Sequence, residues 1–544
     1  MARSPAPSQI RLFPAANFTG GLNLRADAFL LGPNESPDLL DVVLNMEGGF
    51  IQRQVVVPYA SALPANPVAM WPFETPNYQQ IMVATATNMY YTSGGAWTAL
   101  TPTVPAMPAT VKPRATVFNF LLYMVFGSGG GPIRWDGANA TLLTQNWNET
   151  IGTEGATDGN MPMCRFVASH MGRLFCAYTT EAGVDYPNRI RWSHANFAED
   201  WRQEDFIDID VGRDGDFITG IAEFRERLYI FKNNSTTILT GFGPQNFQVT
   251  TLSQDIGAVS QEAILVTDVG LFQFSWPQGV YLDRGNGPYP IFYKLYPLVR
   301  DGWIPSEYRY QIAMGWVNQM LWCSVPYSDS TVNARTYVYN PWIWKNRYMR
   351  FLQGPWYPYS LPISAYATLT EPQGQTPWLA ANSQAPYVGQ LEQNGSQDNW
   401  GGGLTNIDSY FRTRWFDIGQ EAVFKRWRHP DFALRPNSNA PILVEVRKDY
   451  DPSVVYRTFQ LTPGVTAMGA KWDDGTGTVG GLWDDGSGTV GGEWSLLPVN
   501  AEGIVRGGSM GSARSVQLSL YAPAGQTWGI DEITFRYVPK RVSG

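Results

Sequence analysis

The sequence predicts an all-β protein in which a β-propeller of about seven blades is followed by an antiparallel β-sandwich. A meander of three short strands joined by tight turns occurs twice, almost back to back, between Ile218 and Pro290. Similar units recur along the chain at intervals of roughly 40 to 55 residues, which is the period of a propeller blade. The composition also favours strands and turns over long helices, since 54 Gly and 39 Pro accompany only 16% charged residues.

Residues 1–57 do not have the pattern of a blade and form a separate N-terminal segment in this interpretation. We expect a turn-rich start, then a short helical segment near Pro37 to Leu44, then a pair of strands. Such a segment is able to begin or to close a ring of blades.

Residues 58–392 hold the predicted propeller with its inserted loops. The blades align on their middle strands, which are rich in β-branched and aromatic residues and bounded by turn residues. These middle strands begin at Ile81, Leu122, Leu174, Leu228, Leu271, Leu321 and Trp378. One meander cannot bury both of its faces and therefore needs neighbours of its own kind. Six or eight blades stay open as alternatives, as does a large β-sandwich of unrelated sheets.

A Gly-rich linker is predicted at residues 393–403, and a C-terminal sandwich of six antiparallel strands at 404–544. Within the sandwich, a Trp-Asp-Asp-Gly unit occurs at Trp472 and again at Trp483. Because Asp-Asp-Gly is a strong turn signal, the repeat predicts a protruding hairpin over residues 470–495. Stacking between subunits, a contact tip and a plain stabilised hairpin are all open roles for it.

A second group of aromatic residues lies between Trp342 and Tyr359. Packing between blades explains such a group, but large aromatics beside arginines are also typical of subunit interfaces. The interface candidates are Trp342, Trp344, Arg347, Arg350, Trp356, Trp472, Trp483 and Trp494.

The sequence offers no catalytic constellation, and we expect neither enzymatic activity nor a cofactor. The three histidines, His170, His194 and His429, lie in different units without metal-ligand spacing. Ser509 sits in a string that matches a hydrolase elbow, but that motif needs a helix where this chain predicts a strand. The densest carboxylate group is a weak candidate for calcium, although a solvated turn explains it equally well. Its members are Asp208, Asp210, Asp214 and Asp216.

The net charge and the cysteines restrict the expected partners and cellular compartment of the protein. A net charge of −8 argues against a whole-protein electrostatic grip on nucleic acid. The N-terminus has no apolar stretch of signal-peptide length. Cys164, Cys176 and Cys323 form an odd set without metal-ligand spacing, so we expect folding in a reducing cytoplasm.

Several motifs resemble those of the tail nozzle family of short-tailed bacteriophages, also called tail tubular protein B or stabilisation protein. Phe18-Thr-Gly-Gly-Leu-Asn-Leu, Pro33-Asn-Glu-Ser-Pro-Asp and Gly49-Phe-Ile-Gln-Arg look like the opening of these proteins. The run from Leu228-Tyr-Ile-Phe-Lys to Gly279-Val-Tyr is similar to their propeller. Phe411-Arg-Thr-Arg-Trp-Phe-Asp-Ile-Gly with Lys425-Arg-Trp resembles their sandwich. The resemblance does not extend to the Trp472 and Trp483 repeat or to the blade spacing.

The resemblance implies a structural virion protein that forms a homo-hexameric channel at the distal end of the tail. Its implied partners are the tail adaptor ring, tail fibres or spikes, the host cell surface and the genomic double-stranded DNA that passes through without sequence-specific binding. An acidic channel would let DNA slide without the grip that counterion release gives a basic surface. A receptor-binding or glycan-degrading propeller of a phage tail is the alternative function.

Overall fold

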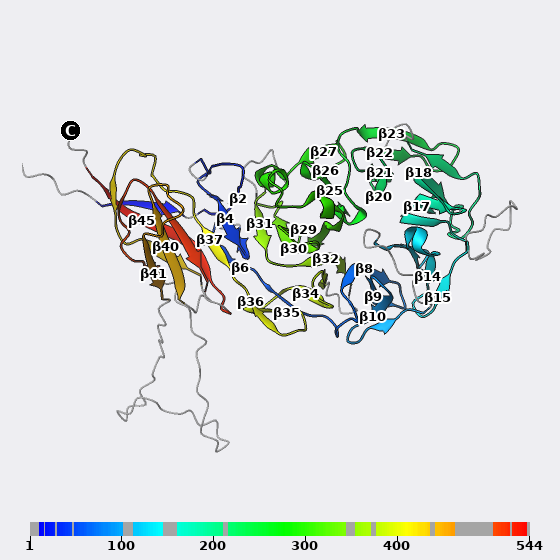
Figure 1. Cartoon of the computed structure of the whole chain (residues 1–544), viewed down its shortest axis with the longest axis horizontal. Coiled ribbons are helices and arrows are strands. Elements are labelled where there is room, and N and C mark those ends of the chain that lie inside the picture. Colours follow the sequence, from blue (N-terminus) through cyan, green and yellow to red (C-terminus); the bar gives the residue numbers. More distant parts are fainter. Residues whose placement is uncertain are drawn as a thin grey trace, which may run out of the picture. The chain divides into compact units, whose positions relative to one another are not determined.

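Figure 1 shows the computed structural model of the chain. The structure describes every residue except 1–9, 16, 28–29, 46–47, 102–111, 145–159, 210–215, 344–353, 371–376, 436–440, 463–503, 523–524 and 541–544. The chain divides into two compact units. The propeller unit comprises Gly21–Asp27 and Arg53–Asn406, and the sandwich unit comprises Met1–Gly20, Ala28–Gln52 and Ile407–Gly544. No helix among the described residues is long and apolar enough to cross a membrane.

The described part of the propeller unit contains seven antiparallel sheets of four strands, which are the blades. Blade 1 is β8 (Pro67–Glu74), β9 (Gln79–Thr85), β10 (Met89–Thr92) and β11 (Thr98–Ala99); blade 2 is β12 (Arg114–Phe118), β13 (Leu121–Val125), β14 (Ile133–Trp135) and β15 (Ala140–Leu142). Blade 3 is β16 (Met163–His170), β17 (Arg173–Glu181), β18 (Val184–Trp192) and β19 (Phe206–Asp208); blade 4 is β20 (Ile218–Phe224), β21 (Arg227–Lys232), β22 (Thr236–Thr240) and β23 (Gln248–Ser253). Blade 5 is β24 (Ile264–Val266), β25 (Leu271–Ser275), β26 (Gly279–Asp283) and β27 (Pro288–Pro290); blade 6 is β28 (Ala313–Val317), β29 (Met320–Pro326), β30 (Asn333–Tyr339) and β31 (Trp356–Tyr359). Blade 7 is β32 (Ile363–Thr368), β33 (Trp378–Asn382), β34 (Val388–Gln393) and β7 (Val55–Pro58).

The blades form a closed ring, as the sequence predicts. The first strand of each blade contacts the first strand of the next, from β8 through β12, β16, β20, β24 and β28 to β32, and β32 contacts β8. Each predicted middle strand is the second strand of its blade. Neighbouring blades cover both faces of these strands, so β25 and β29 are buried at every residue. This double burial explains their near-continuous apolar sequences.

Short helical turns connect some of the strands. They are η1 (Gly127–Gly129), η2 (Gln261–Ala263), η3 (Tyr293–Leu295), α1 (Pro297–Arg300) and η4 (Ser306–Gln311). The first of these lies in the glycine-rich Gly127–Gly131 stretch, between two strands of blade 2. In the same unit, β2 (Gly21–Leu22) lies against β31.

Blade 7 is completed by a strand from the N-terminal part of the chain. Strand β7 pairs antiparallel with β34, with Val57 opposite Gln390. A buried ion pair lies beside this junction: Arg53 Nη1 and Nη2 donate to the two Asp398 carboxylate oxygens at 2.9 and 2.5 Å. Asp398 Oδ1 also accepts a hydrogen bond from the backbone N–H of Val56 at 3.0 Å. The last blade is therefore held by residues more than three hundred positions apart.

The boundaries predicted from the sequence differ from the structure in three places. Residues 1–57 are not a separate segment, because they supply strands to the sandwich unit and β7 to the propeller unit. The expected helix near Pro37 to Leu44 is replaced by β4 (Asp38–Leu40) and β5 (Val42–Leu44). Strand β5 pairs with β6 (Phe50–Gln52) and buries two apolar side chains, which a local pattern does not reveal. The predicted linker 393–403 contains β35 (Gln397–Asn399), paired with β36 (Leu404–Asn406) in the propeller unit.

The sandwich unit consists of two antiparallel sheets, as expected. One sheet contains β1 (Arg11–Ala15), β5, β6, β38 (Lys425–Trp427), β39 (Asp431–Leu434), β42 (Ile504–Arg506), β43 (Gly511–Ala513) and β45 (Gly529–Pro539). The other contains β4, β37 (Tyr410–Arg412), β40 (Ile442–Lys448), β41 (Arg457–Leu461) and β44 (Val516–Tyr521). The short β3 (Glu35–Ser36) precedes β4. The Phe50 ring of the first sheet stacks on the Phe411 ring of the second at 4.2 Å, so the two sheets pack on each other.

We predict that Asp398→Ala destabilises the propeller unit. Arg53 is 2% exposed, and truncating its partner leaves a buried charge uncompensated, which typically costs about 3–5 kcal/mol. The melting temperature of the purified protein measures the loss. Asp301→Ala is the matched control, since it breaks an Arg300–Asp301 pair whose side chains are 58% and 43% exposed. Equal melting temperatures for the two variants would contradict the role of the buried pair.

Candidate functional site

The described members of the predicted calcium cluster have separate partners. Asp208 accepts two hydrogen bonds from Arg189, at 2.8 and 2.9 Å. Asp216 accepts hydrogen bonds from the Asn233 backbone N–H at 3.0 Å and the Ser235 hydroxyl at 3.3 Å. Asp210 and Asp214 lie outside the described residues. Within the described ranges, no group of three or more His, Cys, Asp or Glu residues could hold a metal ion.

The aromatic interface candidates divide into core residues and residues outside the described ranges. Trp356 is fully buried, and its indole Nε1–H donates to the Ile291 carbonyl at 2.9 Å. Its ring packs against those of Phe292 and Tyr339, so Trp356 belongs to the core of this chain and offers no surface to another subunit. Trp342 is half-buried and donates its indole N–H to the Gln319 carbonyl. The remaining candidates lie outside the described residues: Trp344, Arg347, Arg350, Trp472, Trp483 and Trp494, with hairpin 470–495.

Ser509 does not have the surroundings of a hydrolase nucleophile. It lies between β42 and β43, so a strand follows it where the elbow motif requires a helix. Its backbone carbonyl accepts a hydrogen bond from Arg457 at 2.9 Å. The strand predicted beyond it is present as β44.

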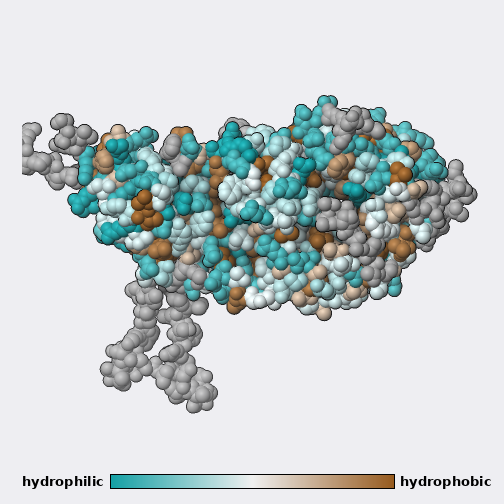
Figure 2. Space-filling model, viewed as in Figure 1, coloured by the Kyte–Doolittle hydropathy of each residue, from teal (hydrophilic) through white to brown (hydrophobic). Residues whose placement is uncertain are grey.

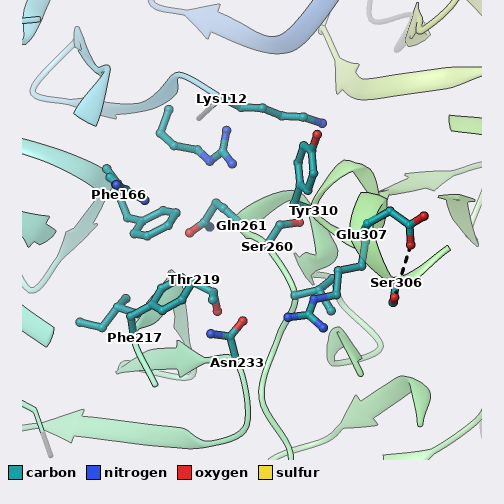
Figure 3. Close-up of a pocket in the computed structure, with 15 residues that line it drawn as sticks. Lys112, Phe166, Phe217, Thr219, Asn233, Ser260, Gln261, Ser306, Glu307 and Tyr310 are labelled. Atoms are coloured by element: carbon teal, nitrogen blue, oxygen red, sulfur yellow. Dashed lines mark hydrogen bonds between the residues drawn. The ribbon is translucent and has the colours of Figure 1, made fainter. Parts of the chain in front are cut away.

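The structure reveals a pocket that the sequence analysis missed. It has a volume of about 490 Å³ and lies where the first strands of blades 2, 3 and 4 meet the segments that lead into blades 5 and 6 (Figure 3). We call it the axial pocket. Its lining residues are Lys112, Arg114, Arg165, Phe166, Phe217, Ile218, Thr219, Asn233, Val259, Ser260, Gln261, Ser306, Glu307, Arg309 and Tyr310.

A second cavity of about 170 Å³ shares Arg114 and Gln261 with the axial pocket and extends between the first strands of blades 1, 5, 6 and 7. Strands β28 and β32 approach closely beside it, since a Cβ atom on Gly315 would lie 2.3 Å from the Tyr366 ring. The two cavities together occupy the centre of the ring of first strands.

The axial pocket contains a buried cluster of charged groups. Lys112 is 6% exposed, and its Nζ has no hydrogen-bond partner among the described residues. Arg114 Nη2 donates to Glu262 Oε2 at 2.5 Å, and its Nη1 donates to the Pro113 carbonyl at 2.7 Å. Burial lowers the pKa of both Lys112 and Arg114, and the Glu262 carboxylate partly offsets this by favouring their charged forms.

Two further arginines line the axial pocket. The Arg165 guanidinium lies 3.8 Å from the centroid of the Tyr178 ring and 3.9 Å from Asp185 Oδ2. Arg309 lies on η4 and is half-buried. Glu307 is the one carboxylate among the described lining residues. Glu262 and Asp185, which lie outside the lining, compensate Arg114 and Arg165, so Lys112 and Arg309 supply the remaining positive charge of the described lining.

Apolar and neutral polar side chains form the rest of the wall. Figure 3 shows Phe166 and Phe217 on one side of the axial pocket, Tyr310 and Glu307 on the other, and Lys112 along one edge. Gln261 is fixed by two hydrogen bonds with the Ile221 backbone, at 2.8 and 2.9 Å. The axial pocket thus combines the hydrogen-bonded Gln261 side chain with aromatic rings and several cations. Such a combination is usual in small-molecule sites.

Comparisons with known proteins identify no family for this chain. No protein-family model and no curated protein matches it. Among solved structures, BamB from Moraxella catarrhalis is 8% identical, with a TM-score of 0.34, over 65% of this chain and 94% of its own. BBS1N in complex with ARL6DN is 12% identical, with a TM-score of 0.37, over 62% of this chain and 97% of its own. YCF48 bound to D1 peptide is 9% identical, with a TM-score of 0.33, over 61% and 95%. Similarity this low carries no argument about function.

We predict that the three cysteines do not react with thiol reagents in the native protein. All three are buried and free, and burial raises the pKa of the Cys176 and Cys323 thiols, so little reactive thiolate forms. Titration with a chromogenic disulfide reagent near pH 8 should find no accessible thiol before unfolding. The same titration in guanidinium chloride should find three. A thiol that reacts quickly in the native protein would contradict the burial of these side chains.

Proposed function

We propose that this chain is a structural virion protein, the distal tail nozzle of a short-tailed bacteriophage, which retains the genome and then conducts DNA during ejection. The proposal begins from the resemblance of its motifs. One structural observation carries it further: motifs that are far apart in the sequence meet in one place in the sandwich unit.

Three of the motifs are joined by an aromatic cluster. The Phe18 ring lies 5.3 Å from the Phe50 ring and 5.4 Å from the Phe411 ring, edge to face in both cases. Phe50 also contacts Trp528 edge to face at 5.4 Å. Aromatic pairs in these arrangements stabilise a core beyond the area that they bury. Packing in a shared core constrains these motif residues together, whereas we would not expect chance matches to contact one another.

Close contacts with neighbouring backbone also explain why two positions of the motifs are glycine. The Gly20 N–H donates to the Asn34 carbonyl at 2.8 Å, and a Cβ atom at Gly20 would lie 2.5 Å from that same oxygen. At Gly49, a Cβ atom would lie 2.8 Å from the Ile530 carbonyl oxygen. Only glycine allows the backbone to approach so closely at these positions. The opening motifs of the family thus correspond to packing requirements of the sandwich unit.

The path of the chain suits a protein that must resist mechanical stress. The chain passes between the sandwich unit and the propeller unit four times, near residues 20, 27, 52 and 406. The sheets of the sandwich unit combine strands from both ends of the chain, namely β1, β4, β5 and β6 with β37 to β45. A nozzle that contains pressurised DNA would benefit from units connected in this way.

The DNA channel of such a nozzle would have to form between copies of the chain. The axial pocket measures about 490 Å³, which is the size of a small-molecule site, and its neighbouring cavity of about 170 Å³ is smaller still. Duplex DNA is on the order of 20 Å wide, with a major groove of about 12 Å. One propeller therefore cannot admit the duplex, and a ring of six subunits around a common axis is the arrangement that we propose.

The surface properties of the chain are compatible with sliding DNA. The chain carries 47 acidic and 39 basic residues, so a channel lined by its average surface would repel phosphates instead of binding them. The face drawn in Figure 2 is mostly hydrophilic, with apolar residues scattered among polar ones. Scattered apolar residues are normal on protein surfaces and need no partner.

We predict that particles assembled without this chain package DNA but fail to keep it. The expected result is a large loss of nuclease-resistant DNA from purified particles, measured against particles that contain the chain. Restoring the protein from a second gene copy is the control.

Two outcomes would instead support the alternative functions. Particles that keep nuclease-resistant DNA but no longer adsorb to cells would indicate receptor binding. Particles that adsorb but lose the ability to depolymerise host polysaccharide would indicate glycan cleavage. Either outcome would contradict the nozzle proposal.

A further inference from the structure

The axial pocket contains a buried lysine whose ammonium group has no hydrogen-bond partner in the described part of the chain. Lys112 is 6% exposed, and its Nζ forms no hydrogen bond with the described residues. A buried charge loses its hydration, and this loss is offset only if other groups pair with it. The nearby carboxylate of Glu262 is already engaged by Arg114, whose Nη2 donates to it at 2.5 Å. Lys112 therefore has unused donors next to an open volume.

The surroundings of Lys112 favour a negatively charged occupant. Arg114 and Arg165 also line the pocket, but Glu262 pairs with Arg114 and Asp185 lies 3.9 Å from Arg165. Among the described lining residues, the cations outside these pairs are Lys112 and the half-buried Arg309, and the one carboxylate is that of the exposed Glu307. This local excess of positive charge occurs in a chain with a net charge of −8. A cluster of cations that opposes the charge of the whole chain attracts anions to that place.

We propose that the axial pocket binds a small organic anion with a carboxylate or phosphate head group. The oxyanion would accept hydrogen bonds from Lys112, since charge-assisted bonds of this kind are the strong ones in proteins. The body of the ligand would lie against Phe166 and Phe217, which Figure 3 shows on the same side of the pocket. A pocket of about 490 Å³ is large enough for such a molecule but not for a nucleic-acid duplex. The proposal is thus independent of the tail-nozzle function.

Isothermal titration calorimetry on the full chain, at constant ionic strength, tests the proposal. The probes are inorganic phosphate and citrate, with glucose as an uncharged control. We expect saturable binding of phosphate, citrate or both, and none of glucose. Binding of phosphate alone or of citrate alone would identify the head group. If neither probe binds saturably, the proposal is overturned.

Variants then assign the binding to this pocket. Lys112→Met keeps the apolar stem and removes the charge, and it should weaken binding about 10- to 100-fold. Arg300→Met removes one positive charge from an exposed position elsewhere in the propeller unit and should leave the affinity unchanged. Unchanged affinity in Lys112→Met would overturn the assignment.

The melting temperature of Lys112→Met distinguishes a lysine that binds a ligand from one that only stabilises the fold. In anion-free buffer, this variant should melt at the same temperature as the unaltered protein or higher, because it removes a buried charge that has no hydrogen-bond partner among the described residues. A large drop in melting temperature would mean that Lys112 supports the fold and would contradict the proposal. Arg309→Gln, at a half-buried position, should also weaken binding, and unchanged affinity in this second variant would contradict the assignment as well.

Discussion

The closure of the propeller depends on one junction, where β7 pairs with β34 and Arg53 meets Asp398. A ring of blades has two ends, and an unclosed ring would expose an unpaired strand edge and the apolar face of its last blade. Here the outer strand of blade 7 comes from Val55–Pro58 and the other three strands come from Ile363–Gln393. Because Asp398 binds both the Arg53 guanidinium and the Val56 N–H, one buried carboxylate fixes the position of the closing strand. The fold therefore forms only when both ends of the propeller are present.

Closure also creates the site at the centre of the ring. The first strands are held next to one another, and the segments that lead into them bring Lys112, Ser260 and Arg309 to one pocket from three different blades. Each of these residues lies at or just before the start of a blade, where a side chain points toward the centre without disturbing the sheet. Lys112 lies in this pocket without a hydrogen-bond partner among the described residues, and this is the basis of the anion site that we propose. Structural and binding roles are thus compatible in the same propeller.

The sequence predicts most of the propeller but little of the site. Middle strands such as Leu271–Ser275 are buried on both faces, so their apolar runs are visible in the sequence. The local pattern at Val42–Leu44 predicts a helix, because the pairing with Phe50–Gln52 that makes it a strand is not visible in the local sequence. The glycines near Asp398 predict a linker, and its ion pair with Arg53 joins residues too far apart for a local pattern to reveal. The axial cations are separated by whole blades, and no motif connects Lys112 with Arg309 before the ring closes.

A cryo-electron reconstruction of particles that carry this chain tests the central claim about its function most directly. The account predicts six copies in a closed ring at the distal end of the tail, around an axial channel wide enough for duplex DNA. It also predicts that the channel runs between subunits, with the propeller axes outside it. A single copy or a threefold assembly on a peripheral spike would contradict the account and would favour receptor binding or glycan cleavage.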